Sequence, residues 1–431
     1  MAILLKSNKI KNISALEILD SRGFPTISVR VELDSGVVAT ASVPAGTSSG
    51  VHEAFELRDG DHKRYQGRGM LKAVASVEQK IAPKLLGLDV SDQKKIDETM
   101  IELDGTANKS QLGANAIVGV SIASARAAAY ATKTPLFKYL RTTLNLQATD
   151  LLATSYNLPQ PQFNMLNGGR HADSGMDVQE FMFVPYGSSF SESLRFAAET
   201  FESLRKKLKD ERFETSVGYE GGYAPKLGNS EQAIEILISA GKDSGLSKKQ
   251  FGIALDVAAS ELVADEAPNE YMFERERIRF GTNSLIEWYA SLVKKFSIIS
   301  IEDGLNQEDW SGWRKLTYEL GSKILIVGDD LTVTSPSRLE RAIGEKAVNS
   351  VIIKPNQIGT LTELAKTVTI AREHNIKMVV SHRSGDTNDP FIADLSVAIG
   401  AEYIKSGSVC RGERVAKYNR LLEIEKKLEQ E

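Results

Sequence analysis

The chain has 431 residues, of which 42% are hydrophobic and 26% charged, and its formal net charge is −4. This composition excludes a disordered or fibrous chain, and the lack of a basic block argues against nucleic acid as the primary partner. The length is more than one ordinary domain needs, so we expect two domains.

The cysteine content and the hydropathy pattern indicate a compartment. A single cysteine, Cys410, rules out an internal disulfide and fits a reducing environment, and we interpret it as a small buried hydrophobe. No stretch approaches the roughly 18 apolar residues of a membrane-spanning helix, and the first ten residues lack the core of a signal peptide. We therefore expect a soluble cytoplasmic protein.

The first third of the chain predicts a small α+β domain, at residues 1–137. Alternating apolar residues over 9–43 are typical of strands, with a turn at Asp34-Ser35-Gly36. Helical patterns follow at residues 70–86, 91–103 and 112–132. The last of these is so rich in Ala, Gly and Ser that it must pack closely on a neighbour.

A loop of small residues, PAGTSSG from Pro44 to Gly50, separates the strands from the helices. It has few side chains that could pack against the rest of the protein. From composition alone, the loop is either a mobile lid or a simple connector.

Residues 138–431 predict an α/β barrel. Short apolar runs recur, and each ends in a polar or charged residue. Most intervals between them are close to the ~25–30 residues that one strand–helix unit of a barrel occupies, and one longer interval holds an insertion, EAPNEYMFERER. Such runs are typical of buried parallel strands, whose carboxyl ends share one face. The residues at these ends are Asp256, Glu302, Asp329, Lys354, His382 and Lys405.

Asp256, Glu302 and Asp329 end successive predicted strands. One such acid alone would be better explained as a helix cap or a partner of Lys or Arg. Three hard oxygen ligands together, without paired Cys or His, favour a Mg²⁺ site.

Lys354 and Glu220 are candidates for proton transfer. Bound cations would depress the pKa of Lys354 and make it a general base, and Pro355 keeps its backbone extended. Such a base beside a metal suits removal of a proton α to a carboxylate, with Glu220 as the acid that protonates a leaving hydroxide. Glu220 precedes two glycines that predict a specified loop shape, and Arg383 with Ser384 suits a phosphate.

A set of motifs spread over nearly the whole chain resembles the glycolytic enolases. The motifs are SRGFPT, PAGTSSGVHEAFELRDGD, LDGTANKSQLGANAIVGVS, LNGGRHA, QEFM, SIEDG, GDDLTVT, IKPNQIGTL and VSHRSGDT. The resemblance implies an α+β N-terminal domain followed by an irregular (β/α)8 TIM-type barrel. It also implies reversible dehydration of 2-phosphoglycerate to phosphoenolpyruvate, with two Mg²⁺ per site, by a homodimer or larger homo-oligomer.

The resemblance also assigns roles to individual residues. Asp256, Glu302 and Asp329 match ligands of the first Mg²⁺, and Ser48 matches a ligand of the second, which arrives with substrate when the lid closes. Lys354 matches the base and Glu220 the acid, assisted by Glu180. The residues that match the substrate-binding shell are His171, Gln179, His382, Arg383, Ser384 and Lys405.

One departure from the family pattern lies beside the acid. The family usually has an acidic residue before the catalytic glutamate, and here it is Tyr219. Loss of a like charge disfavours the protonated form of Glu220. Two alternatives therefore accompany a working enolase: an impaired homologue that acts as a binding or scaffold protein, and a lyase of the same superfamily with another carboxylate substrate.

Overall fold

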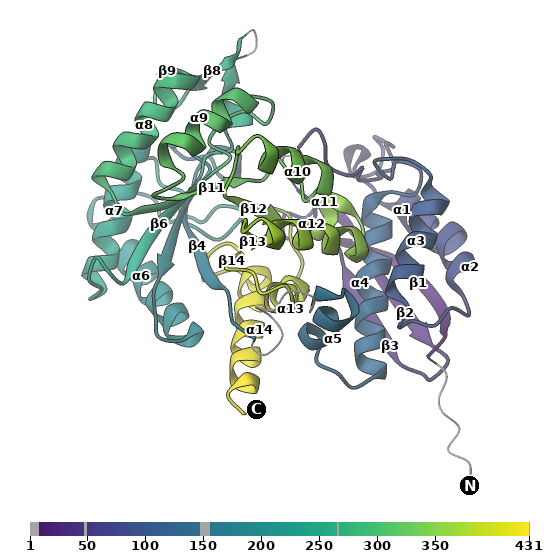
Figure 1. Ribbon diagram of the computed structural model, residues 1–431. Helices are drawn as coiled ribbons and strands as arrows, with labels where there is room; N and C mark the ends of the chain where they lie inside the picture. The colour runs from purple at the N-terminus through teal and green to yellow at the C-terminus, as the bar shows by residue number, and fades with distance from the viewer. Residues whose placement is uncertain (1–7, 47–49, 147–155, 265–266, 431) are drawn as a thin grey trace.

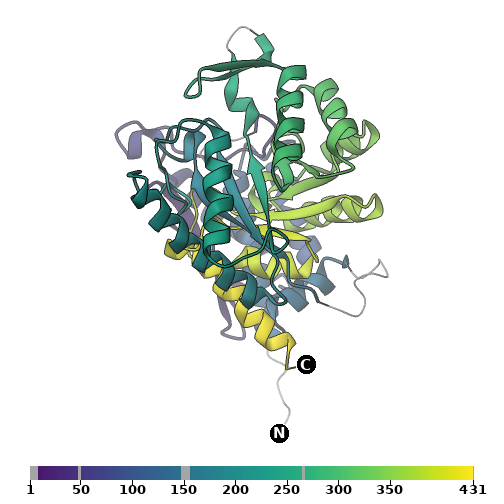
Figure 2. The same ribbon diagram turned by 90° about the vertical axis from the view of Figure 1, so that its left-hand side faces the viewer.

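The computed structural model describes residues 8–46, 50–146, 156–264 and 267–430 (Figure 1). A small N-terminal unit lies beside a larger barrel, and Figure 2, viewed from the barrel side, shows helices in front of the barrel strands. Among the described helices, none is both long and apolar enough to cross a membrane.

The N-terminal unit is a three-stranded antiparallel sheet covered by helices. Strands β1 (Ile10–Leu19), β2 (Pro25–Leu33) and β3 (Val38–Ser42) pair in that order, with the predicted turn between β2 and β3. The helices are α1 (Leu71–Ala75), a π-helical turn (Ser76–Ile81), α2 (Ala82–Leu85), α3 (Gln93–Asp104), α4 (Ala114–Ala131) and α5 (Leu136–Thr143). The predicted helices are thus confirmed, with the first one interrupted by the π turn.

Helix α4 is the close-packed helix that its composition predicts. It packs against β2 and β3 on one side and contacts α11 and α12 of the barrel on the other (Figure 1). A Cβ atom at Gly119 would lie 2.6 Å from a methyl carbon of Val29, so only glycine allows this approach. The predicted domain boundary after residue 137 stays a prediction, because α5 spans it and packs on both α4 and α13.

Eight strands close into the barrel, and they include all six strands predicted from the apolar runs. Their order around the barrel is β10, β11, β12, β13, β14, β4, β5 and β6. The bounds are β4 (Gln160–Asn167), β5 (Glu180–Pro185), β6 (Phe251–Asp256), β10 (Ile298–Glu302), β11 (Leu325–Gly328), β12 (Ser350–Ile353), β13 (Lys377–Ser381) and β14 (Tyr403–Lys405).

Helices surround the barrel, and the long interval after β6 holds a small antiparallel sheet. The helices are α6 (Phe190–Asp210), α7 (Ser230–Asp243), α8 (Thr282–Lys295), α9 (Trp310–Leu320), α10 (Pro336–Gly344), α11 (Pro355–Ile358), α12 (Leu361–Glu373), α13 (Phe391–Ala398) and α14 (Gly412–Leu428). The small sheet consists of β7 (Val263–Ala264), β8 (Ala267–Phe273) and β9 (Ile278–Gly281).

Strand β5 runs against both of its neighbours, and this reversal makes the barrel irregular. It pairs antiparallel with β4 and with β6, whereas the other neighbouring pairs are parallel. The start of β5 therefore lies at the rim where the other strands end. In that register Glu180 pairs with Asp256, which pairs in turn with Glu302.

The N-terminal unit is attached to this rim by backbone contacts and a buried ion pair. Ala45 and Gly385 exchange two backbone hydrogen bonds of 2.8 and 2.9 Å. The guanidinium of Arg126 on α4 donates to both carboxylate oxygens of Asp389, at 2.6 and 2.9 Å. Ala45, close to the end of the described segment 8–46, is thus tied to the barrel.

Arg126→Met should destabilise the protein by about 3–5 kcal/mol, because it leaves the buried carboxylate of Asp389 without its cation. Chemical unfolding followed by circular dichroism measures this. Lys94→Met is the matched control, since Lys94 and Glu98 form an exposed pair and its loss should cost less than about 1 kcal/mol. Equal effects of the two substitutions would contradict the prediction.

Candidate active site

A small polar cavity of about 40 Å³ lies at the rim of the barrel, between the strand ends and the N-terminal unit. Nearly all of the residues predicted from the sequence line it or touch its lining. They are His171, Gln179, Glu180, Glu220, Asp256, Asp329, Lys354, His382, Arg383, Ser384 and Lys405, with Glu302 in contact with Lys405. Ser48 lies outside the described residues. The roles of these side chains stay predictions.

Lys405, at the end of β14, is the centre of a buried charge cluster. Its Nζ lies 2.7 Å from Oε1 of Glu302, 3.1 Å from Oδ2 of Asp256 and 3.5 Å from Oε1 of Glu180. These three acids come from adjacent strands that the β5 reversal brings into one row. Burial opposes a charged lysine, but Asp256, Glu180 and Glu302 outweigh it and raise the pKa of Lys405 well above its ordinary value.

The acids of the rim outnumber its cations, and this excess of negative charge favours the binding of a metal ion. Burial and the neighbouring Asp256 raise the pKa of Glu302 to about 8, although Lys405 acts against them. One ammonium group therefore leaves this set of carboxyls under-neutralised. A divalent cation would supply the missing charge, and Asp256, Glu302 and Asp329 are the hard oxygen ligands that fit Mg²⁺.

Two further acids of the rim, Asp303 and Asp330, were not proposed as ligands from the sequence. Carboxylate oxygens of Asp303, Asp329 and Asp330 all lie within 4.8 Å of one another. Asp303 accepts backbone N–H groups of Asp329 and Asp330 at 2.9 and 3.0 Å, so it shapes the turn that presents Asp329. Burial and the neighbouring acids raise the pKa of Asp303 well above its ordinary value.

Lys354 follows β12 and forms a hydrogen-bonded ion pair with Asp329. Its backbone N–H donates to Thr334 at 2.9 Å, and Gln357 donates to the other oxygen of Asp329 at 2.8 Å. Burial lowers the pKa of Lys354, but Asp329 outweighs burial and raises it. The sequence-based expectation of a depressed pKa for Lys354 assumed that metal cations are bound nearby. Without them, the protein's own groups raise the pKa instead.

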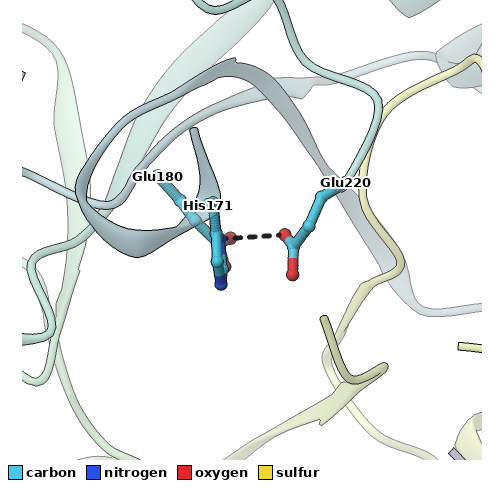
Figure 3. A group of neighbouring side chains, drawn as sticks. All are labelled: His171, Glu180 and Glu220. Atoms are coloured by element: carbon cyan, nitrogen blue, oxygen red, sulfur yellow. Dashed lines mark ion pairs between the residues drawn. The ribbon is translucent and has the colours of Figure 1, made fainter. Parts of the chain in front are cut away.

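His171, Glu180 and Glu220 form a second group of the cavity, shown in Figure 3. Nδ1 of His171 lies 3.6 Å from a carboxylate oxygen of each glutamate, and Nε2 of His382 lies 3.3 Å from Oε2 of Glu220. The side-chain amide of Asn164 also donates to this oxygen, at 3.0 Å. Sequence reasoning did not single out Asn164, because nothing in its local motif marks it.

The two glutamates have opposite pKa shifts. Burial and the charge on Glu220 raise the pKa of Glu180 well above its ordinary value. For Glu220 burial acts in the same direction, but His171, His382 and Arg414 outweigh it and lower the pKa well below its ordinary value. The protein's own groups therefore favour the protonated form of Glu180 and the ionised form of Glu220.

The loop of Glu220 has the specified shape that its glycines predict. Gly221 has a φ of +88°, and a Cβ there would lie 2.6 Å from the carbonyl oxygen of Cys410. The carbonyl of Glu220 accepts the backbone N–H of Ser408 at 2.8 Å. The backbone that carries the Glu220 carboxyl is thus held by the segment that follows β14.

Arg383 meets a carboxylate that sequence reasoning missed. Its guanidinium donates to Glu53 of the N-terminal unit at 3.0 and 3.2 Å, and to Asn356 at 3.1 Å. Glu53 lies in the motif PAGTSSGVHEAFELRDGD, a few residues beyond the small-residue loop, and that proximity was its available signal. An anion that binds Arg383 has to compete with this carboxylate.

Tyr219 lies outside the inner cavity. Its side chain is 41% exposed and lines a larger, open cavity of about 1020 Å³. The two cavities share the lining residues His171, Gln179 and Ala258. The tyrosine that replaces the usual acid therefore faces the approach to the site.

Two family models match the chain. Residues 10–140 match the model described as Enolase, N-terminal domain, and residues 155–431 match the model described as Enolase, C-terminal TIM barrel domain. The two matches follow the sheet-and-helix unit and the closed barrel described above.

Binding of Mg²⁺ should release protons at pH 7, because a cation on Glu302 displaces the proton that its pKa of about 8 retains. The release from Glu302 should decrease as the pH rises through its pKa of about 8, where the carboxyl loses its proton without the metal. Calorimetric titrations in two buffers of different ionisation enthalpy measure it. Glu302→Gln should reduce the release, and Glu308→Gln, an exposed control, should leave it unchanged; a release that Glu302→Gln does not reduce would contradict the prediction.

Proposed function

The chain belongs to the enolase family, and on that premise we propose that it is a glycolytic enolase, which reversibly dehydrates 2-phospho-D-glycerate to phosphoenolpyruvate. The family matches support a lyase of the enolase superfamily. The observation that carries the finer proposal is that Lys354 and the pair Glu180–Glu220 line one cavity together with the acids Asp256 and Asp329. A base, an acid and metal ligands around one space are what this dehydration requires.

Asp256, Glu302 and Asp329 would hold the first Mg²⁺, which supplies the positive charge needed by the dianion formed when the α proton leaves. The second Mg²⁺, with Ser48 as a ligand, stays a prediction outside the described residues. Asp329 is both the partner of Lys354 and a proposed ligand. The more of its charge Asp329 shares with a cation, the less it raises the pKa of the lysine, and the more readily Lys354 becomes the neutral base.

The acid step belongs to the pair of glutamates. Glu220 was the acid predicted from the sequence, with Glu180 assisting. The opposite pKa shifts support a shared role in which Glu180 holds the proton more readily than Glu220 does. Nδ1 of His171 lies 3.6 Å from a carboxylate oxygen of each glutamate, so it can interact with either one as the proton moves between them.

The remaining residues of the cavity suit a small substrate with two anionic groups. Lys405 and Arg383 are buried cations, and His171, Gln179, His382 and Ser384 add polar groups to the same lining. The fork of Arg383 is suited to a phosphate that competes with Glu53. This phosphate site favours 2-phosphoglycerate over the substrates of other lyases of the superfamily.

We also propose a homodimer or larger homo-oligomer in the cytoplasm, as the family resemblance implies. Sedimentation measures the oligomeric state.

The alternative of an impaired scaffold rests on Tyr219. The exposed side chain of Tyr219 lies outside the inner cavity, which argues for an active site. Thermal stabilisation by Mg²⁺ together with phosphoenolpyruvate would favour a glycolytic enolase. Stabilisation by Mg²⁺ alone would favour another lyase of the superfamily, and no stabilisation by either would favour a scaffold protein.

The ultraviolet absorbance of enol product should rise when 2-phosphoglycerate and Mg²⁺ are added, and chelator should stop it. Lys354→Ala should lower kcat by about 10²–10⁴-fold, the usual contribution of a general base. Lys109→Ala is the matched control, since Lys109 is also buried and paired with a carboxylate, Glu363, outside the cavity. A folded wild-type protein that binds Mg²⁺ without turnover would refute the proposed activity.

Tyr219→Asp should move the limb of the kcat profile that reports the general acid, on which kcat falls as the pH rises, to higher pH. The reason is that an added negative charge raises the pKa of Glu220. Exposure of this position screens the effect, so the shift should stay below about 1 pH unit. Tyr219→Asn is the uncharged control. Identical pH profiles for the two variants would show that residue 219 does not tune Glu220.

A further inference from the structure

A buried guanidinium touches the site from the side of the C-terminal helix. Arg414, in the first turn of α14, is 0% exposed. Its Nη1 lies 2.6 Å from Nδ1 of His382 and donates to the carbonyl of Arg383 at 2.6 Å. Its Nη2 donates to the carbonyls of Ser384 and Tyr219 at 2.6 and 3.0 Å. Sequence reasoning did not single out this arginine.

These contacts determine the protonation of the His382 ring. A guanidinium has only donors, so the nitrogen it faces, Nδ1, must be an acceptor without a proton. The neutral ring then carries its proton on Nε2, which lies 3.3 Å from Oε2 of Glu220. The other tautomer would set two N–H groups against each other and leave Glu220 without this donor.

We propose that Arg414 is a positioning residue, which fixes His382 in the Nε2–H tautomer and so directs a hydrogen-bond donor at Glu220. The inference rests on the proposed function, because it deepens the role of Glu220 in the acid pair. The same guanidinium holds the carbonyl of Tyr219, the residue before Glu220. Arg414 therefore orients both the ring that donates to the carboxylate and the backbone that carries it.

The consequence concerns which glutamate holds the proton. Glu220 accepts from His382 and from Asn164, whose amide donates at 3.0 Å, so two donors favour its ionised form. Of the two glutamates, Glu180 is then the one that holds a proton more readily. The charged groups that face His382 are Glu220, Arg414 and Asp386, and burial together with Arg414 lowers its pKa to about 4 against the two acids.

Nitrogen-15 NMR of the histidine rings tests the tautomer in the wild-type protein. The chain has 5 histidines, and the His382→Gln variant identifies the signals of His382 by their loss. The proposal expects an unprotonated Nδ1 and a protonated Nε2 at pH 7. A ring protonated on Nδ1, or on both nitrogens, would overturn it. Because no substrate is present, this result stands whether or not the protein has enolase activity.

Arg414→Gln tests the effect on turnover. Without the neighbouring cation, the pKa of His382 rises, so the acidic limb of the kcat profile should move upward by about 1 pH unit. We expect kcat to fall by about 100-fold, the cost of a misplaced catalytic group, with little change in KM. The Nδ1 signal of His382 should shift toward the protonated form.

Lys417→Gln is the matched control for these measurements. Lys417 lies one turn further along α14, is 1% exposed and donates to the carbonyls of Thr387 and Glu413. Its loss should lower stability without moving the pH profile or the His382 signals. Equal shifts in both variants would reduce Arg414 to a structural role. If Arg414→Gln does not fold, the tautomer of His382 measured in the wild-type protein is the test of the proposal.

Discussion

The ammonium group of Lys405 holds the acid-lined end of the barrel together. It lies within 3.5 Å of carboxylates from β5, β6 and β10, in a place where unpaired charges would be expensive to bury. One cation cannot neutralise three acids, and burial together with the neighbouring Asp256 keeps the pKa of Glu302 high. The stability of this end of the barrel and its affinity for a divalent cation therefore have the same origin.

The site is completed by groups from both units of the chain and from its far end. Glu53 comes from the N-terminal unit and contacts Arg383 after β13. Arg414 comes from the last helix and contacts the loop of β13 and the peptide before Glu220. Each of these contacts fixes a polar group in a water-poor space, where a group left unpaired costs more than it would at the surface. The groups of the candidate site thus come from all parts of the fold.

The strands, the helices and most candidate residues could be predicted from the sequence, for local reasons. Asp256, Glu302, Asp329, Lys354 and Lys405 each follow an apolar run, and the carboxyl ends of parallel strands meet at one face. The reversal of β5 could not be read this way, since an apolar run has no direction. Asn164, Glu53 and Arg414 were also missed, because their local patterns are those of an ordinary strand, loop and helix.

The sequence by itself determined the family, through motifs spread along the chain, and the chemistry available to it, through the residue types at the strand ends. Only the tertiary structure decided how those groups affect one another. The opposite pKa shifts of Glu180 and Glu220 depend on neighbours spread along the chain from His171 to Arg414, and the tautomer of His382 depends on a residue of α14. Electrostatic effects of this kind act through space over a few ångströms, and the separation of two residues along the chain does not predict them.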